Sequence, residues 1–226
     1  MTKNFKVRLS VSLLLLALGA LFLFTFNGIP FKIFFGLFAV VAGIELLSFF
    51  KKSHSVLNII VAILEIAFLV FGTIFVSKAT ILYIILIIFG VCGYDVFAYL
   101  FGTALGGLFF PKSRPFPFVS KNKTWEGTFM GLITSAALVG IILLIANSYD
   151  YVFFLTGPLA LVGDLFESFL KRTFKVKDSN EIIIKNPVFA KLELLVGGSE
   201  GHGGYLDRID SAAFTTTILL LIAAIL

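Results

Sequence analysis

Four polar residues at the end of an apolar segment have the types and the spacing for chemistry. Asp164, Glu167, Ser168 and Lys171 stand at i, i+3, i+4 and i+7, so a helix would carry all four on one face. Ionisable groups beside an apolar run are costly in lipid and usually mark a functional cavity. The pattern therefore predicts a site where this segment ends.

A second polar group lies downstream, around a glycine pair that lets a ligand approach the backbone closely. It consists of His202, Gly203, Gly204, Asp207, Arg208 and Asp210. Its aspartates, with Asp164, offer the hard oxygen atoms that Mg²⁺ prefers. Lys171, Arg172 and Lys177 supply positive charge for phosphate groups. We favour a metal and phosphate site, and a structural network of ion pairs is the alternative.

The composition is that of a membrane protein. Of its 226 residues, 59% are hydrophobic and 28 are Phe, and the mean hydropathy of +1.05 is too high for a soluble domain. The single cysteine, Cys92, excludes a disulfide framework and a zinc site built from several thiolates. The excess of 18 Lys and Arg over 13 Asp and Glu reflects topology and phosphate-bearing partners in such a protein, so we expect no nucleic-acid partner.

The hydrophobic runs predict an all-α, polytopic integral membrane protein with about seven transmembrane helices, in a range of six to eight. The first turn is expected at the breaker cluster of residues 27–30. The expected spans are approximately 9–26, 31–50, 56–77, 79–101, 127–146, 151–170 and 211–226. We group 1–101 as N-terminal transmembrane helices and 102–226 as a catalytic membrane region, whose polar loops are 102–126 and 171–210.

The basic residues predict the orientation of these spans. If the N-terminus is cytoplasmic, 16 of the 18 Lys and Arg residues lie inside, and only Lys32 and Lys78 lie outside. The positive-inside rule therefore favours N-in and C-out, with both polar loops in the cytoplasm, where nucleotides are found. No small-residue cleavage pattern follows the first run, so we expect a retained span. The compact sequence and the lack of a targeting pattern favour a bacterial plasma membrane, and an organelle membrane is the alternative.

Three acidic residues lie within apolar runs, where each costs roughly 2.5 to 3.5 kcal/mol at a helix centre. Glu65 is expected to face a neighbouring helix, protonated or hydrogen-bonded. Glu45, near the end of its span, would either snorkel or line a cavity. Asp95 shares a helical face with Ala98, Tyr99 and Gly102 and is expected to line a cavity.

The loop before the fifth span reads SKNKTWEG over residues 120–127. Ammonium groups and helix N-terminal amides both attract phosphate, so Ser120, Lys123 and Thr124 are candidates for a phosphate site. In the alternative, Thr124 caps the following helix and Trp125 anchors a solvated basic loop at the membrane interface.

Together these stretches resemble the signature of the phosphatidate cytidylyltransferases, also called CDP-diacylglycerol synthases. The similarity is carried by DVFAY with Gly102 at 95–102, SKNKTWEG at 120–127, SFLKR at 168–172, Lys177-Asp178, and HGGYLDRID at 202–210. Glu45-Leu46 is similar to an early glutamate of the family. The combination is highly specific, although no single piece is.

The resemblance implies a nucleotidyltransferase of phospholipid biosynthesis that joins CTP and phosphatidic acid into CDP-diacylglycerol, releases pyrophosphate and depends on Mg²⁺. The implied catalytic residues are Asp164, Lys171, Arg172, Asp207, Arg208 and Asp210, of which Asp164, Asp207 and Asp210 would form the metal site. The expected substrate-binding residues are Asp95, Ser120, Lys123, Thr124, Ser168, Lys177, Asp178, His202, Gly203 and Gly204.

Two other functions remain open from the sequence. A CTP-dependent polyprenol or phytol kinase would transfer the γ-phosphoryl group of CTP instead of the cytidylyl group. An ion-coupled transporter would use Glu45, Glu65, Asp95 and Asp164 as an ion path, but it leaves the clustered lysines and the GHGG segment unexplained. Membrane lipids are expected partners in every case, and a homodimer is one assembly that the sequence leaves open.

Overall fold

The computed structural model describes residues 29–49, 55–111, 113–120, 122–176 and 206–225, with the backbone alone at 207, 208, 223 and 224. Helices and turns make up the described chain, which contains no strand, so the all-α prediction is confirmed. The elements are α2 (Ile29–Phe49), α3 (Val56–Lys78), α4 (Ile81–Ala104), α5 (Trp125–Ala146), the 3₁₀ helix η2 (Tyr151–Leu155), α6 (Thr156–Thr173) and α8 (Leu206–Ile225).

Within the described residues, five helical segments are long and apolar enough to cross a membrane. They are α2, α3, α4, α5 and the continuous segment Tyr151–Thr173, which joins η2 to α6. Helix α8 carries a shorter apolar stretch, Ile209–Ile222. The chain is thus built as a polytopic membrane protein. The count of seven spans and the N-in, C-out orientation stay predictions, and the expected first span at 9–26 lies outside the described residues.

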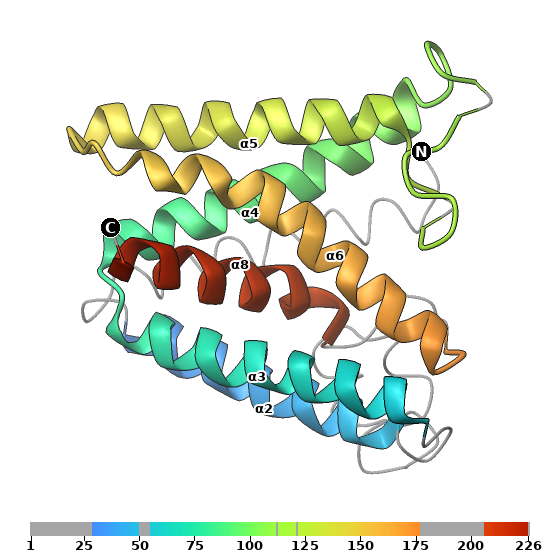
Figure 1. Cartoon of the computed structure of the whole chain (residues 1–226). Helices are drawn as coiled ribbons and strands as arrows, with labels where there is room; N and C mark the ends of the chain where they lie inside the picture. The colour runs from blue at the N-terminus through green and yellow to red at the C-terminus, as the bar shows by residue number, and fades with distance from the viewer. Residues whose placement is uncertain (1–28, 50–54, 112, 121, 177–205, 226) are drawn as a thin grey trace.

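Helix α8 lies between the pair α2 and α3 on one side and the group α4, α5 and α6 on the other (Figure 1). The buried apolar side chains form two clusters, one centred on α2 and α3 and the other on α4, α5 and η2. Helix α6 contributes Leu170 to the first and Ala160 to the second, while α8 contributes Leu206 and Leu219 in the same way. These two helices therefore join the two halves of the bundle.

Small residues set the distance between α4 and α5. A Cβ atom at Gly127 would lie 2.4 Å from the carbonyl oxygen of Ala98, and one at Gly131 would lie 2.9 Å from that of Tyr94. This is the close helix contact that glycines four residues apart permit in membranes. Ala98 and Gly102, which share a face of α4 with Asp95, therefore pack against α5.

Side chains close several helix ends. Ser55 accepts a hydrogen bond from the Asn58 amide (3.2 Å) and caps α3. Lys32, near the start of α2, donates from Nζ to the carbonyl oxygens of Ser77 (2.9 Å) and Ala79 (3.0 Å) at the end of α3. A cation is favourable there because a helix C-terminus carries partial negative charge. Lys32 therefore has a structural role apart from the basic residues of the polar loops.

Several predicted boundaries are wrong. The turn at 27–30 ends too late, because α2 begins at Ile29 and proline is tolerated in a first helical turn. The last span begins at Leu206 rather than near residue 211, since Leu206, Ile209 and Ala213 form a buried stripe at helical spacing. Asp207, Arg208 and Asp210 therefore lie on a helix instead of in the loop 171–210. Helix α6 likewise continues to Thr173.

Replacement of Gly127 with alanine should destabilise the bundle, because the added methyl group meets backbone atoms that cannot rotate away. We expect a loss of about 1–3 kcal/mol, which is typical of overpacking. Gly43→Ala is the matched control, since nothing lies within 4 Å of a Cβ at that position. Thermal unfolding in detergent micelles should show a lower midpoint for Gly127→Ala alone. Equal midpoints for the two variants would contradict this packing.

Candidate functional site

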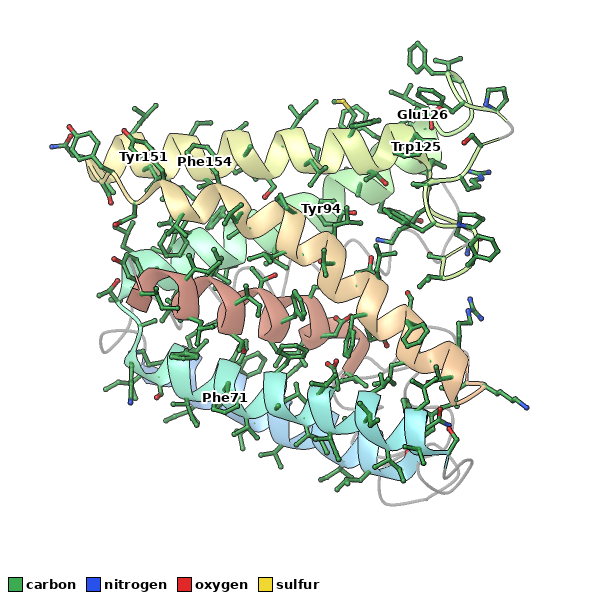
Figure 2. All side chains as sticks on the ribbon, in the orientation of Figure 1. Phe71, Tyr94, Trp125, Glu126, Tyr151 and Phe154 are labelled. Carbon is green, nitrogen blue, oxygen red and sulfur yellow. The ribbon has the colours of Figure 1, made fainter. Side chains whose placement is uncertain are left out.

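An ion pair joins the loop before α5 to helix α6, two regions in which the sequence predicts site residues. The Nζ atom of Lys123, in the loop before α5, is paired with Oδ2 of Asp164 on α6, and the two side chains are 17% and 34% exposed. The same Nζ atom lies 5.6 Å from the ring centroid of Tyr94, a buried residue of α4 that Figure 2 shows inside the bundle. The loop 120–127 and helix α6 therefore meet at one place, as the sequence predicts.

Further carboxylates surround this pair. Asp95 on α4 is exposed, and both Asp164 and Lys123 lie within electrostatic range of it. Asp210 on α8 is buried and interacts with the charges of Asp164, Asp95 and Glu65. Gly163 makes this arrangement possible, because a Cβ there would lie only 2.9 Å from the Cα of Ser211, where α6 crosses α8. Three predicted site aspartates from three helices thus lie within electrostatic range of one another, and we call them, together with Lys123, the carboxylate cluster.

The predicted metal site is described only in part. Among the residues that the structure describes, no three His, Cys, Asp or Glu side chains are close enough to hold a metal ion. Asp164 and Asp210 lie within electrostatic range of each other, but the side chain of the third predicted ligand, Asp207, lies outside the description. One or two carboxylates completed by phosphate oxygens suit Mg²⁺, so the described pair fits this donor chemistry. The metal site itself stays a prediction.

The four residues expected on one face of α6 do lie on that helix, but two of them pair with each other. Lys171 Nζ is 2.6 Å from Glu167 Oε2, an i,i+4 ion pair in which the carboxylate side chain is only 2% exposed. Ser168 is half-buried and Arg172 is exposed. Lys171 is therefore held beside a carboxylate in this structure, whereas Arg172 is accessible to a ligand.

In the loop before α5, the capping alternative is confirmed for Thr124. The residue is buried, and its Oγ1 atom accepts a hydrogen bond from the Gly127 amide at 3.1 Å. Ser120 is half-buried, and its amide donates to the carbonyl oxygen of Phe116 at 2.8 Å. Trp125, the first residue of α5, donates from its indole nitrogen to Ser113 Oγ at 3.1 Å, so it bonds the start of the helix to the preceding loop.

Glu126 organises the loop between α4 and α5, a role that our sequence reasoning missed. Its side chain is buried, and Oε1 accepts hydrogen bonds from the amides of Gly107 (3.1 Å), Phe109 (3.0 Å) and Phe110 (3.1 Å). Glu126 and Trp125 lie at the end of α5 that faces this loop (Figure 2). The position of Glu126 within SKNKTWEG was the only sign in the sequence that it has a role. The sequence could not indicate its partners, because they lie 16 to 19 residues away and are backbone amides.

Glu45 also has a role that the sequence did not specify. It is 2% exposed, and its Oε2 atom accepts a hydrogen bond of 2.8 Å from the amide of Leu206, the first residue of α8. A carboxylate at a helix N-terminus binds free amides and opposes the positive end of the helix dipole. Glu45 therefore does not snorkel, and it anchors the helix that carries Asp207 and Asp210. The cavity-lining alternative stays a prediction. Glu65 is buried on α3 and lies within electrostatic range of Asp210 on α8, so it faces a neighbouring helix, as expected.

Several predicted site residues cannot be placed. Lys177, Asp178, His202, Gly203 and Gly204 lie outside the described residues. For Asp207 and Arg208 the structure gives the helical backbone of α8 and no side chain.

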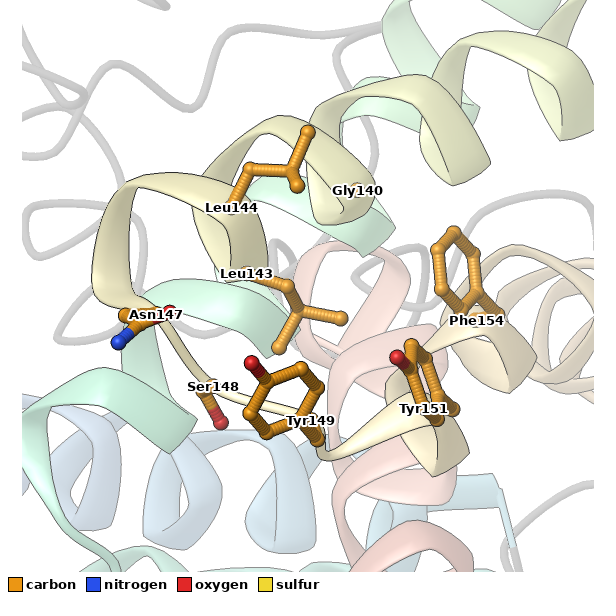
Figure 3. A pocket seen from close by; sticks show the side chains of 8 residues that line it. All are labelled: Gly140, Leu143, Leu144, Asn147, Ser148, Tyr149, Tyr151 and Phe154. Atoms are coloured by element: carbon orange, nitrogen blue, oxygen red, sulfur yellow. The ribbon is translucent and has the colours of Figure 1, made fainter.

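A shallow cavity of about 310 Å³ lies elsewhere, at the far end of α5 (Figure 3). Its walls are mostly apolar and include Leu143, Tyr149, Tyr151 and Phe154. None of the predicted site residues lines it. We therefore assign the candidate site to the Lys123 and Asp164 cluster, not to this cavity.

Replacement of Glu126 with leucine should free the loop, because three amides lose one common acceptor. Hydrogen exchange at Gly107, Phe109 and Phe110 should then become faster. Glu126→Gln keeps a carbonyl oxygen of similar size and should preserve more of the protection. Unchanged exchange in Glu126→Leu would show that this carboxylate does not hold the loop.

Replacement of Glu45 with leucine should lower stability by about 1–3 kcal/mol, since it leaves a buried amide at the start of α8 without its acceptor. Glu45→Gln should lose less, because its side-chain oxygen can still accept the bond. Ser48→Ala is a control on the same helix, as it removes a local bond to the Glu45 carbonyl oxygen. Thermal unfolding in micelles distinguishes them, and equal losses in Glu45→Leu and Ser48→Ala would refute the anchoring role.

Comparison with known proteins agrees with the resemblance noted in the sequence. The chain is 34% identical over 140 residues to a protein named phosphatidate cytidylyltransferase from Rickettsia bellii, covering 57% of this chain and 52% of the relative. It is 35% identical over 137 residues to the protein of that name from Bacillus subtilis, covering 58% of this chain and 43% of the relative. The chain spans about half or less of the length of these curated relatives.

A chloroplastic protein from Arabidopsis thaliana, phosphatidate cytidylyltransferase 5, is 35% identical over 135 residues, which cover 56% of this chain and 28% of the relative. The sequence profile of the cytidylyltransferase family matches residues 59–185. That match includes Asp95, Lys123 and Asp164 and ends before the aspartates of α8. Since it extends over more than half of the sequence, this chain belongs to the cytidylyltransferase family.

Proposed function

We propose that this chain transfers a cytidylyl group from CTP to phosphatidic acid, giving CDP-diacylglycerol and pyrophosphate. Its relatives carry the name of that activity. The observation that carries the proposal is the ion pair between Lys123 and Asp164, because it unites the SKNKTWEG loop with α6 beside Asp95 and Asp210. The family match and these names do not favour the lipid kinase or the transporter.

The charge balance of the cluster suits an added cation. Asp95, Asp164 and Asp210 contribute three carboxylates, and Lys123 is the cation that the described residues place among them. Carboxylates gathered in a site of low polarity are costly unless protons or cations neutralise them. We propose that Asp164 and Asp210, with Asp207, hold Mg²⁺, which would neutralise phosphate charge when it is bound.

In this reaction the protein mainly has to position the two substrates and neutralise the charge of their phosphate groups. A phosphate oxygen of phosphatidate attacks the α-phosphorus of CTP, and a new P–O bond forms as the bond to the β-phosphate breaks. Phosphatidate is already anionic near neutral pH, so the step requires no strong general base. We propose that Lys123 and Arg172 contribute positive charge to the phosphates, and His202 would orient a phosphate or its own loop.

The position of the cluster also suits a lipid substrate. Asp164 lies in the helical segment Tyr151–Thr173, which is long and apolar enough to cross a membrane, and Lys123 lies in the loop before α5. Acyl chains can then stay in the bilayer while the headgroup reaches the charged residues. We propose an integral protein of a bacterial plasma membrane with this site on the cytoplasmic side, in keeping with its bacterial relatives.

Purified protein in micelles should move label from [α-³²P]CTP into a lipid product when phosphatidic acid and Mg²⁺ are present. Asp164→Asn and Asp210→Asn should each lower kcat by on the order of 10²-fold or more, because they remove charge that acts at the reacting phosphates. Removal of divalent ions with EDTA should abolish the transfer.

Asp150→Asn is the matched control, since Asp150 bonds Ser148 (2.6 Å) beyond the far end of α5. It should leave the rate unchanged. Label from [γ-³²P]CTP should appear in pyrophosphate, whereas its appearance in lipid would reveal a kinase. A folded wild-type protein that transfers neither label would refute the proposed activity for this chain.

A further inference from the structure

The loop between α4 and α5 exposes large apolar side chains. Leu108 is 67% exposed, Phe109 70%, Phe110 45% and Phe118 96%. Loops that face water are normally polar, and a cluster of exposed apolar side chains usually marks a contact with a partner or a membrane. Leu108, Phe109 and Phe110 are consecutive, and Phe118 lies in a second turn of the same loop. We call these four side chains together the apolar loop patch.

The loop is held with its polar atoms turned inward. Glu126 collects the amides of Gly107, Phe109 and Phe110 on one buried oxygen, and Trp125 bonds Ser113. Gly107 has a φ of +86°, a left-handed conformation that glycine adopts without strain. Phe118 lies within a turn in which the Ser120 amide donates to the Phe116 carbonyl oxygen at 2.8 Å. Several backbone amides of the loop are thus bonded within the protein, while its apolar side chains are exposed.

The patch continues the exposed apolar surface of α4. At the end of α4, Tyr99 is 53% and Leu100 is 39% exposed, and both belong to a helix long enough to span a membrane. The loop follows directly and lies at the ends of α4 and α5 (Figure 1). Arg114 is exposed in the same loop. Apolar side chains beside a cation match the boundary between acyl chains and anionic headgroups.

We propose that the loop at residues 105–120 docks into the interface of an anionic bilayer. The apolar loop patch would enter the outer part of the acyl-chain region, and Arg114 would contact headgroup phosphates. This surface is separate from the carboxylate cluster, and the proposal does not depend on the reaction that the cluster performs.

The test places a fluorescent reporter on the patch. In a Cys92→Ala background, Phe109→Cys and Phe118→Cys are labelled with an environment-sensitive dye, and the full chain is reconstituted into phosphatidylglycerol vesicles. Vesicles with doxyl quenchers at shallow and deep positions report depth. Ile133→Cys, 60% exposed on α5, is the reference inside the bilayer. Lys175→Cys, exposed beyond α6, is the reference in water.

We expect blue-shifted emission at both loop positions, with stronger quenching by shallow than by deep doxyl groups. The Ile133 label should show the opposite order. In Arg114→Gln, shallow quenching of the loop labels should fall. Emission like that of the Lys175 label would overturn the proposal, as would blue-shifted emission that no doxyl lipid quenches, because a second copy or another part of the chain would then cover the patch.

Discussion

A carboxylate buried in an apolar helix bundle must find a donor or a cation, and this constraint joins distant parts of the chain. Asp164 pairs with Lys123 across 41 residues, and Glu45 accepts the amide of Leu206 across 161 residues. An unpaired buried charge costs several kcal/mol in a protein interior, so each contact favours one arrangement of the helices over its competitors. Glu45, one of the three acidic residues that looked like isolated liabilities in the sequence, is therefore a point at which the bundle is fixed.

The helices can satisfy this constraint because small residues let them approach. Gly127 and Gly131 bring α5 against α4, and Gly163 brings α6 against α8 next to Ser211. The contact between Gly163 and Ser211 matters for chemistry, because Gly163 precedes Asp164 and Ser211 follows Asp210 in the sequence. Close packing and the carboxylate cluster are thus two results of one helix crossing.

Glu126, in the first turn of α5, is another buried carboxylate that binds backbone donors, and it shapes the loop before this helix. Glu126 draws three backbone amides inward, and the side chains of that segment are left to point away from the protein. Such a loop would expose too much apolar surface in water, whereas at a membrane interface that surface has a partner. The loop that ends at Lys123 would then place the charged site at the depth of lipid headgroups, which is where the proposed substrate carries its phosphate.

The sequence by itself determined the helices, since apolar runs of sufficient length have few other options in a membrane. It also predicted that the 120–127 loop and α6 form one site, and it pointed to the family. The tertiary structure decided which group each carboxylate binds, because the partners of Glu45 and Glu126 are backbone amides that every residue except proline carries. It also decided that α8 begins at Leu206, since the stripe of Leu206, Ile209 and Ala213 is interrupted by charged residues and becomes a buried face only when α2 and α3 pack against it.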